Sequence, residues 1–563
     1  MSRWLRLRSL LRRERALVAL TLAAAFLLFY RLDQHHFWAD EAITAFYARS
    51  IVTSGRGLPS AWDGRNLVAF GGGGSLDRNL RPTPYPMLQF YLAAPFFALF
   101  GRGHETFAGR FPFALLGLAT VPLTYWLALQ WTRQRAAALA AAILLATSVQ
   151  FLLFARQCRY YALTGFFCVL LLLLYRYLGG RRRGILAGFI LVAFLLFHSH
   201  FMIFYTFMGA LGTGYLIADR DRRRLWPLLF AAAILLVLTV PYVVAFAIAG
   251  AGEAMEAGEP KTWFDRLTLF GWYLRDLNRA TFFPVLAVPL LPLLWLPVTR
   301  ANERPRDQGA DPNPALFFLT VIVAQVMLTC AVSDEPVRPP HKFQDASLRY
   351  IVNILPLTCI LLGMICARVR QWSAWAAVPM LGILVFTNFF TLERPRSFFA
   401  DYLRELSRGY KTSTSVVVEV LKQATREDDL VLVEPPYQRD PLIFYLGDRL
   451  RFCSVLSPDD THLLPRHRER LPAYIYSGEV VPDWMVMFGR RRVRHDISRY
   501  LEEKGAQFDR ATLPVHWQDR SRPELIWHLF SPMRRVAEHE RVFVWRLVGL
   551  GGGQAAQHPA ASN

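Results

Sequence analysis

The sequence holds few cysteines and none of the short motifs that mark several common enzyme classes. Its six cysteines form no Cys-x-x-Cys pair, so neither a disulfide framework nor a zinc site is indicated. The Gly-x-Ser-x-Gly and His-Glu-x-x-His motifs are absent, and the glycine run 71–74 lacks the Gly-Lys-Ser/Thr that completes a P-loop. No internal repeat is found. A hydrophobic content of 53% excludes a disordered or collagen-like chain.

Acidic residues are also scarce, with 43 Asp and Glu against 64 Lys and Arg, a net charge of +21. A charge of this size can indicate a nucleic-acid partner. Residues 393–563 hold 26 basic and 23 acidic groups, however, so +18 of the total belongs to the first 392 residues. Basic loops between apolar segments of about 20 residues mark the cytoplasmic side of a membrane protein, and no nucleic acid is needed to explain them. These basic clusters lie at 3–15, 133–135, 176–183, 220–224, 300–306 and 368–370.

The apolar segments predict a polytopic α-helical membrane protein with about 11 transmembrane helices. A cytoplasmic N-terminus places every basic cluster inside and the C-terminal part outside. The stretch from Met87 to Phe100 is short for a crossing and contains Pro95, so an interfacial helix is predicted there. No small-residue cleavage site follows Tyr30, which favours an uncleaved first helix. The predicted crossings are 16–32, 110–131, 136–155, 160–177, 184–199, 201–218, 225–249, 282–299, 315–333, 348–367 and 372–391.

The chain divides into three parts by composition. Residues 1–392 are expected to form the transmembrane domain, with 33–109 as a first outer loop that carries interfacial helices. Residues 393–550 are expected to form an extracytoplasmic α/β domain, because strand-like and helix-like segments alternate there. Residues 551–563 are predicted to be a disordered tail. The expected strands are 430–434, 451–455, 484–488 and 542–548, and the expected helices are 412–425, 441–446 and 494–504.

Two adjacent carboxylates, Asp40 and Glu41, follow directly after the first apolar segment. Carboxylates at the mouth of a membrane domain can take a proton from an acceptor hydroxyl or bind a divalent cation. The same residues also suit a helix start, with Asp40 as the N-cap and Glu41 beside the positive end of the helix dipole. The sequence leaves both interpretations open.

Several arginines are predicted on the same outer face, against the positive-inside bias. Arg81 lies in a proline-rich stretch, Arg156 and Arg159 connect the third and fourth helices, and Arg349 begins the tenth. Guanidinium groups bind phosphate oxygens in a bidentate manner, so a phosphate is the predicted partner, with lipid headgroups as the alternative. His200, at the end of the fifth helix, is on this face too, where a structural hydrogen bond is the ordinary role of a histidine.

In their order these motifs resemble GT-C glycosyltransferases. More narrowly, they resemble the protein O-mannosyltransferase superfamily and its bacterial relatives, the lipid A aminoarabinose and galacturonic acid transferases. The resemblance covers residues 15–390. It is carried by Phe37-Trp38-Ala39-Asp40-Glu41-Ala42, the Pro-x-Pro approach to Phe100-Gly101, Arg110-Phe111-Pro112, Arg159-Tyr160-Tyr161-Ala162-Leu163, the histidine before Phe201, and Arg349-Tyr350-x-x-x-x-Leu355-Pro356.

The resemblance implies an enzyme of the cytoplasmic (inner) membrane that takes a sugar from a polyprenyl-phosphate donor. It would transfer the sugar, with inversion, to an acceptor hydroxyl of lipid A, another glycan or a protein on the outer face. By position, Asp40 would be the catalytic carboxylate, and Glu41 its neighbour in the acceptor site or in a site for a divalent cation, Mg²⁺ or Mn²⁺. Arg81 would touch the donor phosphate. The residues expected to line the same pocket are Arg159, Tyr161, His200, Arg349 and Tyr350.

One position departs from the family pattern, because many relatives carry an acidic residue where this chain has Gln157. If that carboxylate positions an acceptor or a cation, the chemistry here depends more on Asp40 or the acceptor differs. Two other classes of function remain as alternatives. A transporter or flippase for lipid-linked sugars would favour charges within the membrane segments and pseudo-repeats, and a non-catalytic envelope-assembly subunit would act through its outer domain.

Overall fold

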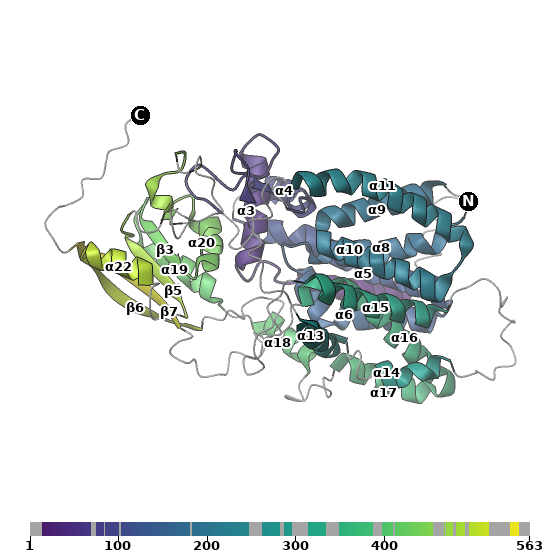
Figure 1. The fold of residues 1–563 in the computed structure, drawn as a ribbon. Coiled ribbons are helices and arrows are strands. Elements are labelled where there is room, and N and C mark those ends of the chain that lie inside the picture. Colours follow the sequence, from purple (N-terminus) through teal and green to yellow (C-terminus); the bar gives the residue numbers. More distant parts are fainter. Residues whose placement is uncertain are drawn as a thin grey trace.

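The computed structural model consists of a bundle of long helices and a smaller domain built on a β-sheet, with helix α3 (Ala39–Thr53) between them (Figure 1). The predicted tail 551–563 lies outside the described residues. The structure describes residues 14–68, 75–83, 85–100, 103–180, 183–246, 262–281, 287–295, 313–333, 348–386, 397–408, 411–453, 467, 469–476, 480–489, 495–516 and 541–550.

The bundle contains five helices that are long and apolar enough to cross a membrane, or six if the bent pair α6 (Arg135–Thr147) and α7 (Val149–Ala155) forms one span. This confirms a helical membrane protein among the described residues. The five are α5 (Glu105–Thr132), α10 with its π-helical end η1 (Phe201–Gly214 and Tyr215–Asp219), α11 (Arg222–Phe246), α15 (Pro314–Val332) and α16 (Leu355–Trp372) with the preceding turn η5 (Val352–Ile354). The turn η4 (Leu348–Tyr350) lies just before the last of these spans.

The predicted count of about 11 crossings is not confirmed. Several predicted crossings form apolar helices of 10–17 residues, shorter than the roughly 20 residues that a bilayer core requires. The crossing expected at 282–299 contains only the short helices α14 (Ala287–Leu290) and η3 (Leu291–Leu294) in its described part, and α13 (Trp263–Thr281) is a helix in a predicted outer loop. The shorter apolar helices are α2 (Arg15–Phe29), α4 (Leu88–Phe100), α8 (Tyr161–Tyr177), α9 (Arg183–Ser199) and α17 (Ala374–Phe386).

Two features explain how these helices pack. The helix pair α6 and α7 bends by 64° at Ser148, whose hydroxyl accepts a hydrogen bond from the Phe151 amide and so caps α7. Helices α6 and α16 approach closely at Gly363, where a Cβ atom would come within 2.5 Å of the Ala137 carbonyl oxygen. A side chain at Gly363 would therefore push these two helices apart.

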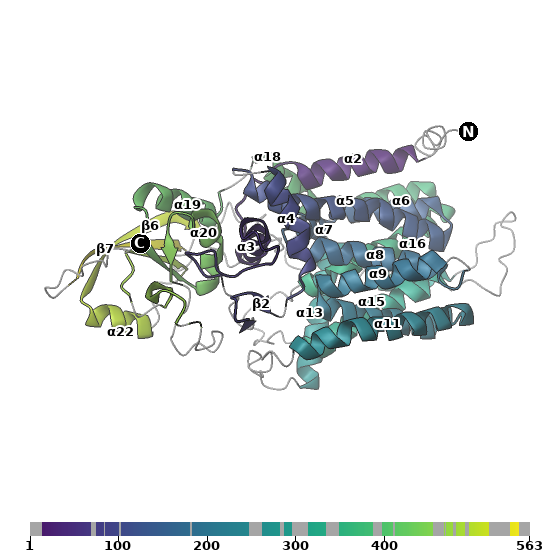
Figure 2. The ribbon, with the colours of Figure 1, turned by 90° about the horizontal axis from the view of Figure 1, so that it is seen from above.

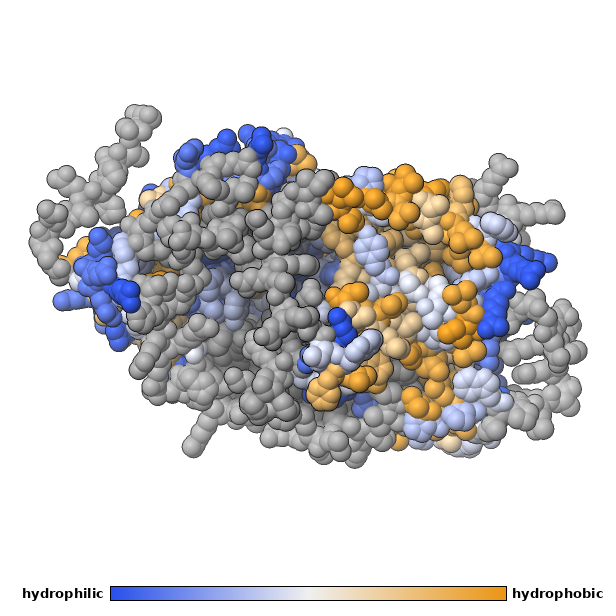
Figure 3. Space-filling view, viewed as in Figure 1, coloured by the Kyte–Doolittle hydropathy of each residue, from blue (hydrophilic) through white to orange (hydrophobic). Residues whose placement is uncertain are grey.

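The end of the bundle remote from the sheet domain gathers basic residues. Arg135 pairs with Glu14 at 3.0 Å, and Arg224 donates to the Arg176 carbonyl oxygen across two loops. Figure 3 shows this end as a hydrophilic band beside the orange flank of the bundle. The clusters predicted at 133–135, 176–183 and 220–224 thus have described members at one end, the pattern expected of the cytoplasmic side.

The opposite end of the bundle carries the first loop. Helix α3 runs across this end, at a steep angle to the bundle helices (Figures 1 and 2). A two-stranded hairpin follows, formed by β1 (Ser75–Leu76) and β2 (Pro82–Thr83). The stretch predicted as an interfacial helix is indeed helical, as α4.

The C-terminal domain contains a five-stranded sheet in the order β4-β3-β5-β7-β6. Strand β3 is parallel to β4 and β5, whereas β7 is antiparallel to β5 and β6. The predicted strands and helices of this region are found, although the strand predicted at 451–455 is observed only at 451–452 and residues 454–455 lie outside the described residues. Strand β6 and helix α18 were not predicted. The elements are α18 (Phe398–Arg408), α19 (Ser413–Ala424), β3 (Leu430–Glu434), η6 (Pro436–Gln438), α20 (Arg439–Leu446), β4 (Arg451–Phe452), η7 (Ala473–Ile475), β5 (Trp484–Phe488), α22 (His495–Glu503), β6 (Ala506–His516) and β7 (Arg541–Leu550).

Helix α20 joins the sheet domain to α3 through buried contacts. The Phe444 ring lies 5.1 Å from the Phe37 ring, and the Arg49 guanidinium stacks on it at 4.3 Å. The Tyr445 hydroxyl accepts a hydrogen bond from the Phe37 amide and also bonds to the Thr106 hydroxyl at the start of α5. The domain is therefore packed directly on the helix that carries the predicted catalytic carboxylate.

Candidate active site

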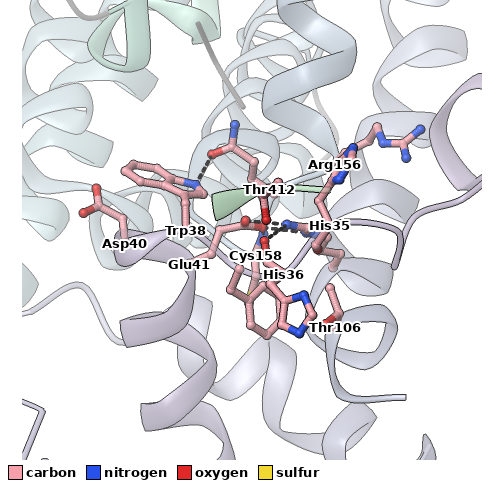
Figure 4. A network of polar contacts seen from close by, with 12 residues as sticks. His35, His36, Trp38, Asp40, Glu41, Thr106, Arg156, Cys158 and Thr412 are labelled. Atoms are coloured by element: carbon pink, nitrogen blue, oxygen red, sulfur yellow. Dashed lines mark hydrogen bonds and ion pairs between the residues drawn. The ribbon is translucent and has the colours of Figure 1, made fainter. Parts of the chain in front are cut away.

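Asp40 lies in the first turn of α3, which begins just after the buried Trp38. Trp38, and not Asp40 as one interpretation of the sequence proposed, occupies the N-cap position, and no side-chain oxygen caps the helix there. Asp40 therefore does not cap the N-terminus of α3. Its side chain, 26% exposed, points away from Glu41 (Figure 4).

The Asp40 carboxylate lies between two arginines that come from distant parts of the chain. Its Oδ2 atom is 3.6 Å from Arg159 Nη2 and 3.7 Å from Arg349 Nη1. Arg159 follows α7, and Arg349 precedes α16, so the bundle brings together three segments more than 100 residues apart. The Arg159 side chain is also fixed by bonds from Nη1 to the Asp40 carbonyl oxygen and to the Thr44 hydroxyl, at 3.2 and 3.0 Å.

Both arginines keep part of their hydrogen-bonding capacity unused. The Nε atoms of Arg159 and Arg349 are buried and have no hydrogen-bond partner among the described residues. A buried donor without a partner costs about 1–3 kcal/mol, so these groups are typically satisfied by a ligand or by water. Two guanidinium groups beside one carboxylate leave a net charge of +1 and open N–H groups, which is suited to an anion with several oxygens.

Aromatic rings surround this cluster. The Arg159 guanidinium lies over the Tyr85 and Tyr160 rings, with centroids at 6.0 and 5.4 Å, and Arg349 lies over Tyr350 at 4.7 Å. Tyr161 packs against Tyr160 at 4.5 Å. The predicted residues Tyr161 and Tyr350 are thus brought to the site, while Tyr85 and Tyr160 were not predicted.

His200 also packs against the tyrosine rings that surround this cluster. Its ring lies 4.3 Å from Tyr160 and 5.9 Å from Tyr350, and its Nδ1 atom accepts a hydrogen bond from the Ile203 amide as the N-cap of α10. Burial, together with the charges of Arg159 and Arg349, lowers the pKa of His200 from 6.5 to about 3. His200 is therefore neutral near pH 7, and the structural role anticipated from the sequence is accounted for by its cap.

Glu41 is fully buried and turned toward the interior, away from the Asp40 cluster (Figure 4). Its two oxygens accept hydrogen bonds from Arg110 Nε and Nη2 at 2.8 and 2.7 Å, and one of them also accepts from the Cys158 amide at 2.8 Å. Arg110 in turn donates to the carbonyl oxygens of Leu32, His35 and His36. The carboxylate of Glu41 is thus used to fix the turn before α3 and the segment that carries Arg159.

Arg156 and Arg159, the two arginines predicted between the third and fourth crossings, have different roles. Arg156 donates to the carbonyl oxygens of Leu27 and Arg31 and to the Tyr402 hydroxyl, so protein groups account for its position. Gln157, at the position that departs from the family pattern, accepts a hydrogen bond from the Trp38 indole at 3.1 Å (Figure 4). Arg159 is the member of this segment that reaches Asp40.

Arg81 lies in the hairpin of the first loop. Its backbone pairs with Asp77, and the hairpin contacts the C-terminal domain through a bond between the Asp77 carbonyl oxygen and His467 Nε2 at 2.9 Å. Within the described residues, no contact joins the Arg81 side chain to the cluster of Asp40, Arg159 and Arg349. Its predicted contact with a donor phosphate stays a prediction.

The C-terminal domain supplies two charged residues that the sequence did not single out. Arg439 and Asp440 begin α20, are both buried, and pair with each other at 3.1 Å. Burial raises the pKa of Asp440 to about 6, with Arg439 opposing the rise and the negative charge of Asp40 adding to it. Tyr47 on α3 lies within electrostatic reach of Asp440, Arg439 and Arg159, and its own pKa is raised by burial. The sequence does contain a feature that could have identified these two residues, because a pair of adjacent opposite charges directly precedes the apolar run Pro441–Leu446.

The donor groups present do not fit the divalent cation that was considered for Asp40 and Glu41. Asp40 already faces two guanidinium groups, which repel a cation, and Glu41 is taken up by Arg110. Within the described parts of the chain, no cluster of three or more His, Cys, Asp or Glu side chains is arranged to hold a metal. We therefore derive no chemical step from a metal.

The chain is similar to a known protein family and to solved structures. Residues 84–244 match the family model described as dolichyl-phosphate-mannose-protein mannosyltransferase. The crystal structure of ArnT from Cupriavidus metallidurans bound to undecaprenyl phosphate is similar with a TM-score of 0.52 and 17% identity, covering 96% of this chain and 98% of that one. The apo structure of the same ArnT gives a TM-score of 0.52 and 17% identity over 94% and 97% of the two chains.

No curated protein sequence matches the chain. The matched region 84–244 contains Arg110, Arg159, Tyr161 and His200, which are among the motif residues of the sequence. The likeness to ArnT extends the common fold over nearly the whole length of both chains, including the C-terminal domain. The family match over residues 84–244 and the ArnT fold together confirm that this membrane protein resembles the GT-C glycosyltransferases of the protein O-mannosyltransferase type, as its motifs indicate.

Proposed function

We propose that this protein transfers a sugar, with inversion, from a polyprenyl-phosphate donor to an acceptor hydroxyl on the outer face of the cytoplasmic membrane. The observation that carries the proposal is the Asp40 carboxylate held between Arg159 and Arg349, whose buried Nε groups have no hydrogen-bond partner in the part of the chain that the structure describes. The ArnT structure with undecaprenyl phosphate supports the choice of a prenyl phosphate as the ligand. The acceptor hydroxyl belongs to lipid A, another glycan or a protein.

The charges of the site suit this reaction at each stage. Before transfer, two arginines, one Asp40 carboxylate and a donor phosphodiester with one negative charge sum to zero. The acceptor oxygen then attacks the anomeric carbon, the bond from that carbon to the phosphate oxygen breaks, and the acceptor proton passes to Asp40. The leaving prenyl phosphate carries a second negative charge while Asp40 becomes neutral, so the sum is again zero. The arginines therefore stabilise the charge that develops on the leaving group.

The arrangement of the two ends of the bundle also suits the routes by which donor and acceptor would reach Asp40. The basic loops lie at the far end of the bundle from Asp40, which supports an outer location of the site under the positive-inside rule. A lipid donor would then approach from the bilayer beside the bundle, and an acceptor from the side of the sheet domain. Tyr85, Tyr160 and Tyr350 supply ring faces of the kind that pack on sugars and on the arginine side chains.

The first experiment measures binding of undecaprenyl phosphate to the purified protein in detergent. Arg159→Gln should weaken binding by about 10-fold or more, because a charge-assisted hydrogen bond contributes about 1.5–3 kcal/mol. Asp40→Asn should tighten the same binding, because it removes the negative charge that competes for the arginines. Arg404→Gln, a change at a largely exposed arginine of α18, serves as the control and should leave binding unaltered.

The second experiment measures transfer by mass spectrometry. Envelope membranes from cells of the source organism that lack this gene contain both the lipid-linked donor and the unmodified acceptor, whatever their identity. Wild-type protein added to them should produce one sugar mass on an envelope component, and Asp40→Asn should reduce that product by about 100-fold or more, the usual contribution of a general base. Transfer by Asp40→Asn at the wild-type rate, or no product with the wild type, would overturn the proposal.

A further inference from the structure

Thr44 is a fully buried threonine of α3, one helical turn after Asp40. Residues four apart lie on the same side of a helix, so Thr44 belongs to the side of α3 that carries Asp40. Its hydroxyl donates a hydrogen bond to the Asp40 carbonyl oxygen at 3.1 Å and accepts one from Arg159 Nη1 at 3.0 Å. One buried hydroxyl therefore joins α3 to an arginine that lies more than 100 residues further along the chain.

The Nη1 atom of Arg159 makes a second hydrogen bond to α3, to the Asp40 carbonyl oxygen at 3.2 Å. The two N–H bonds of Nη1 lie in the plane of the guanidinium group. Two acceptors on this one nitrogen therefore fix the orientation of the plane, whereas one acceptor alone would let the group turn. Arg159 is only 6% exposed, so the two acceptors of α3 are what holds this end of the group.

The opposite edge of the Arg159 guanidinium consists of Nε and Nη2. Nε is buried and has no hydrogen-bond partner among the described residues, and Nη2 lies 3.6 Å from Asp40 Oδ2. The Tyr85 side chain also bonds to Arg159. The N–H bonds of Nε and Nη2 are parallel along this edge, which is the geometry in which a guanidinium binds two oxygens of one phosphate. The bonds of Nη1 to α3 thus leave the edge that suits a phosphate turned toward the site.

We propose that Thr44 is a positioning residue for the donor, whose hydroxyl holds Arg159 so that the edge formed by Nε and Nη2 receives two oxygens of the prenyl phosphate. The inference rests on the proposed function, in which Arg159 binds that phosphate. Thr44 acts through Arg159 and does not itself contact the donor. Because the same bonds join Arg159 to the backbone of Asp40, they also set the position of the leaving phosphate relative to the carboxylate that takes up the acceptor proton.

A matched control is available in α5. Thr124 is as buried as Thr44, and its hydroxyl donates to the Thr120 carbonyl oxygen, four residues earlier, at 2.8 Å. Such bonds within a helix are common for threonine. Thr124 makes no hydrogen bond to an arginine within the described parts of the chain, so the bond to Arg159 is what distinguishes Thr44.

The test measures the affinity of the purified protein in detergent for undecaprenyl phosphate. Thr44→Val keeps the shape of the side chain and removes the hydroxyl. It should weaken binding by about fivefold, because a hydrogen bond to a charged group is lost while the bond from Nη1 to the Asp40 carbonyl oxygen stays. Thr44→Ser keeps the hydroxyl and should bind as the wild type does. Thr124→Val should leave the affinity unaltered.

A double variant separates positioning of Arg159 from a general loosening of α3. In the Arg159→Gln background, Thr44→Val should cause no further loss of affinity, because the hydroxyl then has no guanidinium group to hold. Loosening of the helix would lower the affinity in both backgrounds. Thr44→Cys serves as a second variant if Thr44→Val folds poorly, since a thiol is only a weak acceptor, and it should weaken binding in the same direction.

The outcomes separate this inference from the proposed function. Wild-type affinity in Thr44→Val and Thr44→Cys would overturn the role of Thr44 and leave that of Arg159 intact. Equal losses in the wild-type and Arg159→Gln backgrounds, or a Thr44→Ser variant as weak as Thr44→Val, would show a purely structural effect and would also overturn it. Absence of binding by the wild type would instead contradict the proposed function itself.

Discussion

Replacing Glu41 by glutamine should cost stability, whereas replacing the adjacent Asp40 should cost transfer. The Glu41 carboxylate is fully buried and accepts two hydrogen bonds from Arg110 and one from the Cys158 amide. A glutamine keeps one acceptor oxygen but turns an NH₂ group toward groups that are themselves donors, and it leaves the Arg110 charge without its partner. Breaking a buried ion pair in this way costs about 3–5 kcal/mol.

The assay is the thermal stability of the purified protein in detergent, followed by the fraction that remains monodisperse after heating. Glu419→Gln provides a matched control, because Glu419 is exposed on α19 and its pairing with Lys411 is open to solvent. That change should leave the stability unaltered. The folded fraction of Glu41→Gln should keep its affinity for undecaprenyl phosphate, since none of the described contacts of Glu41 reaches the side chains of Asp40, Arg159 or Arg349.

The reasoning would be refuted if Glu41→Gln had wild-type stability and lost transfer as Asp40→Asn does. That result would place Glu41 in the chemical step, as the sequence resemblance implies. A loss of stability together with transfer that persists per folded molecule would instead establish that Glu41 holds the turn before α3 in place.

Three other changes have clear expected outcomes. His36 is half-buried against Tyr445 and bonds to the Ser415 hydroxyl, and its partial burial, followed by the charge of Arg110, lowers its pKa to about 4. The folded protein thus binds fewer protons than the unfolded chain between pH 6.5 and 4. The free energy of unfolding therefore falls by about 3 kcal/mol as the pH falls through this range. His36→Gln should remove this pH-dependent loss of stability when unfolding is measured at pH 7 and at pH 4.5. Arg156→Met should lower the melting temperature without changing the affinity for undecaprenyl phosphate, the opposite of Arg159→Gln, and equal effects of the two on binding would contradict the separation of their roles. Gly363→Ala should lower the melting temperature, because the added methyl group meets the Ala137 carbonyl oxygen at 2.5 Å, and an unaltered melting temperature would show that α6 and α16 separate without cost.

Sequence patterns predicted the long membrane helices and four of the five strands of the C-terminal sheet. Apolar periodicity is a local property, so α11 and α15 were placed within three residues of their observed ends, whereas α5 begins five residues before the predicted start and α16 begins seven residues after it. The count of crossings was less certain because hydropathy does not distinguish a full span from an apolar helix of 13 to 17 residues such as α17 or α9. Strand β6 carries Asp509, Arg510 and Pro514 among its apolar residues, which obscured its strand character.

The site was predictable only as far as its motifs extend. Arg159 and Arg349 stand out because they are cationic on a face where the positive-inside rule disfavours them. Glu41 could not be separated from Asp40 by sequence, since the two are adjacent and differ only in the direction that the first turn of α3 gives their side chains. Asp440 lies 400 residues from Asp40, and only the packing of Phe444 on Arg49 puts the helix of one beside the helix of the other.

The order of strands in the C-terminal sheet has a consequence for how the protein matures. Strand β7 follows the other described strands of the sheet in the chain, yet it lies inside the sheet, between β5 and β6. The sheet cannot close until residue 550 has left the ribosome, and α20 lies in the same domain. A nascent chain that has already assembled α3 and the arginines of the bundle therefore still lacks the closed sheet that supports α20 against α3. Synthesis itself delays closure of the sheet until β7 has been made, so shorter chains should bind a prenyl phosphate without the packing of α20 on α3.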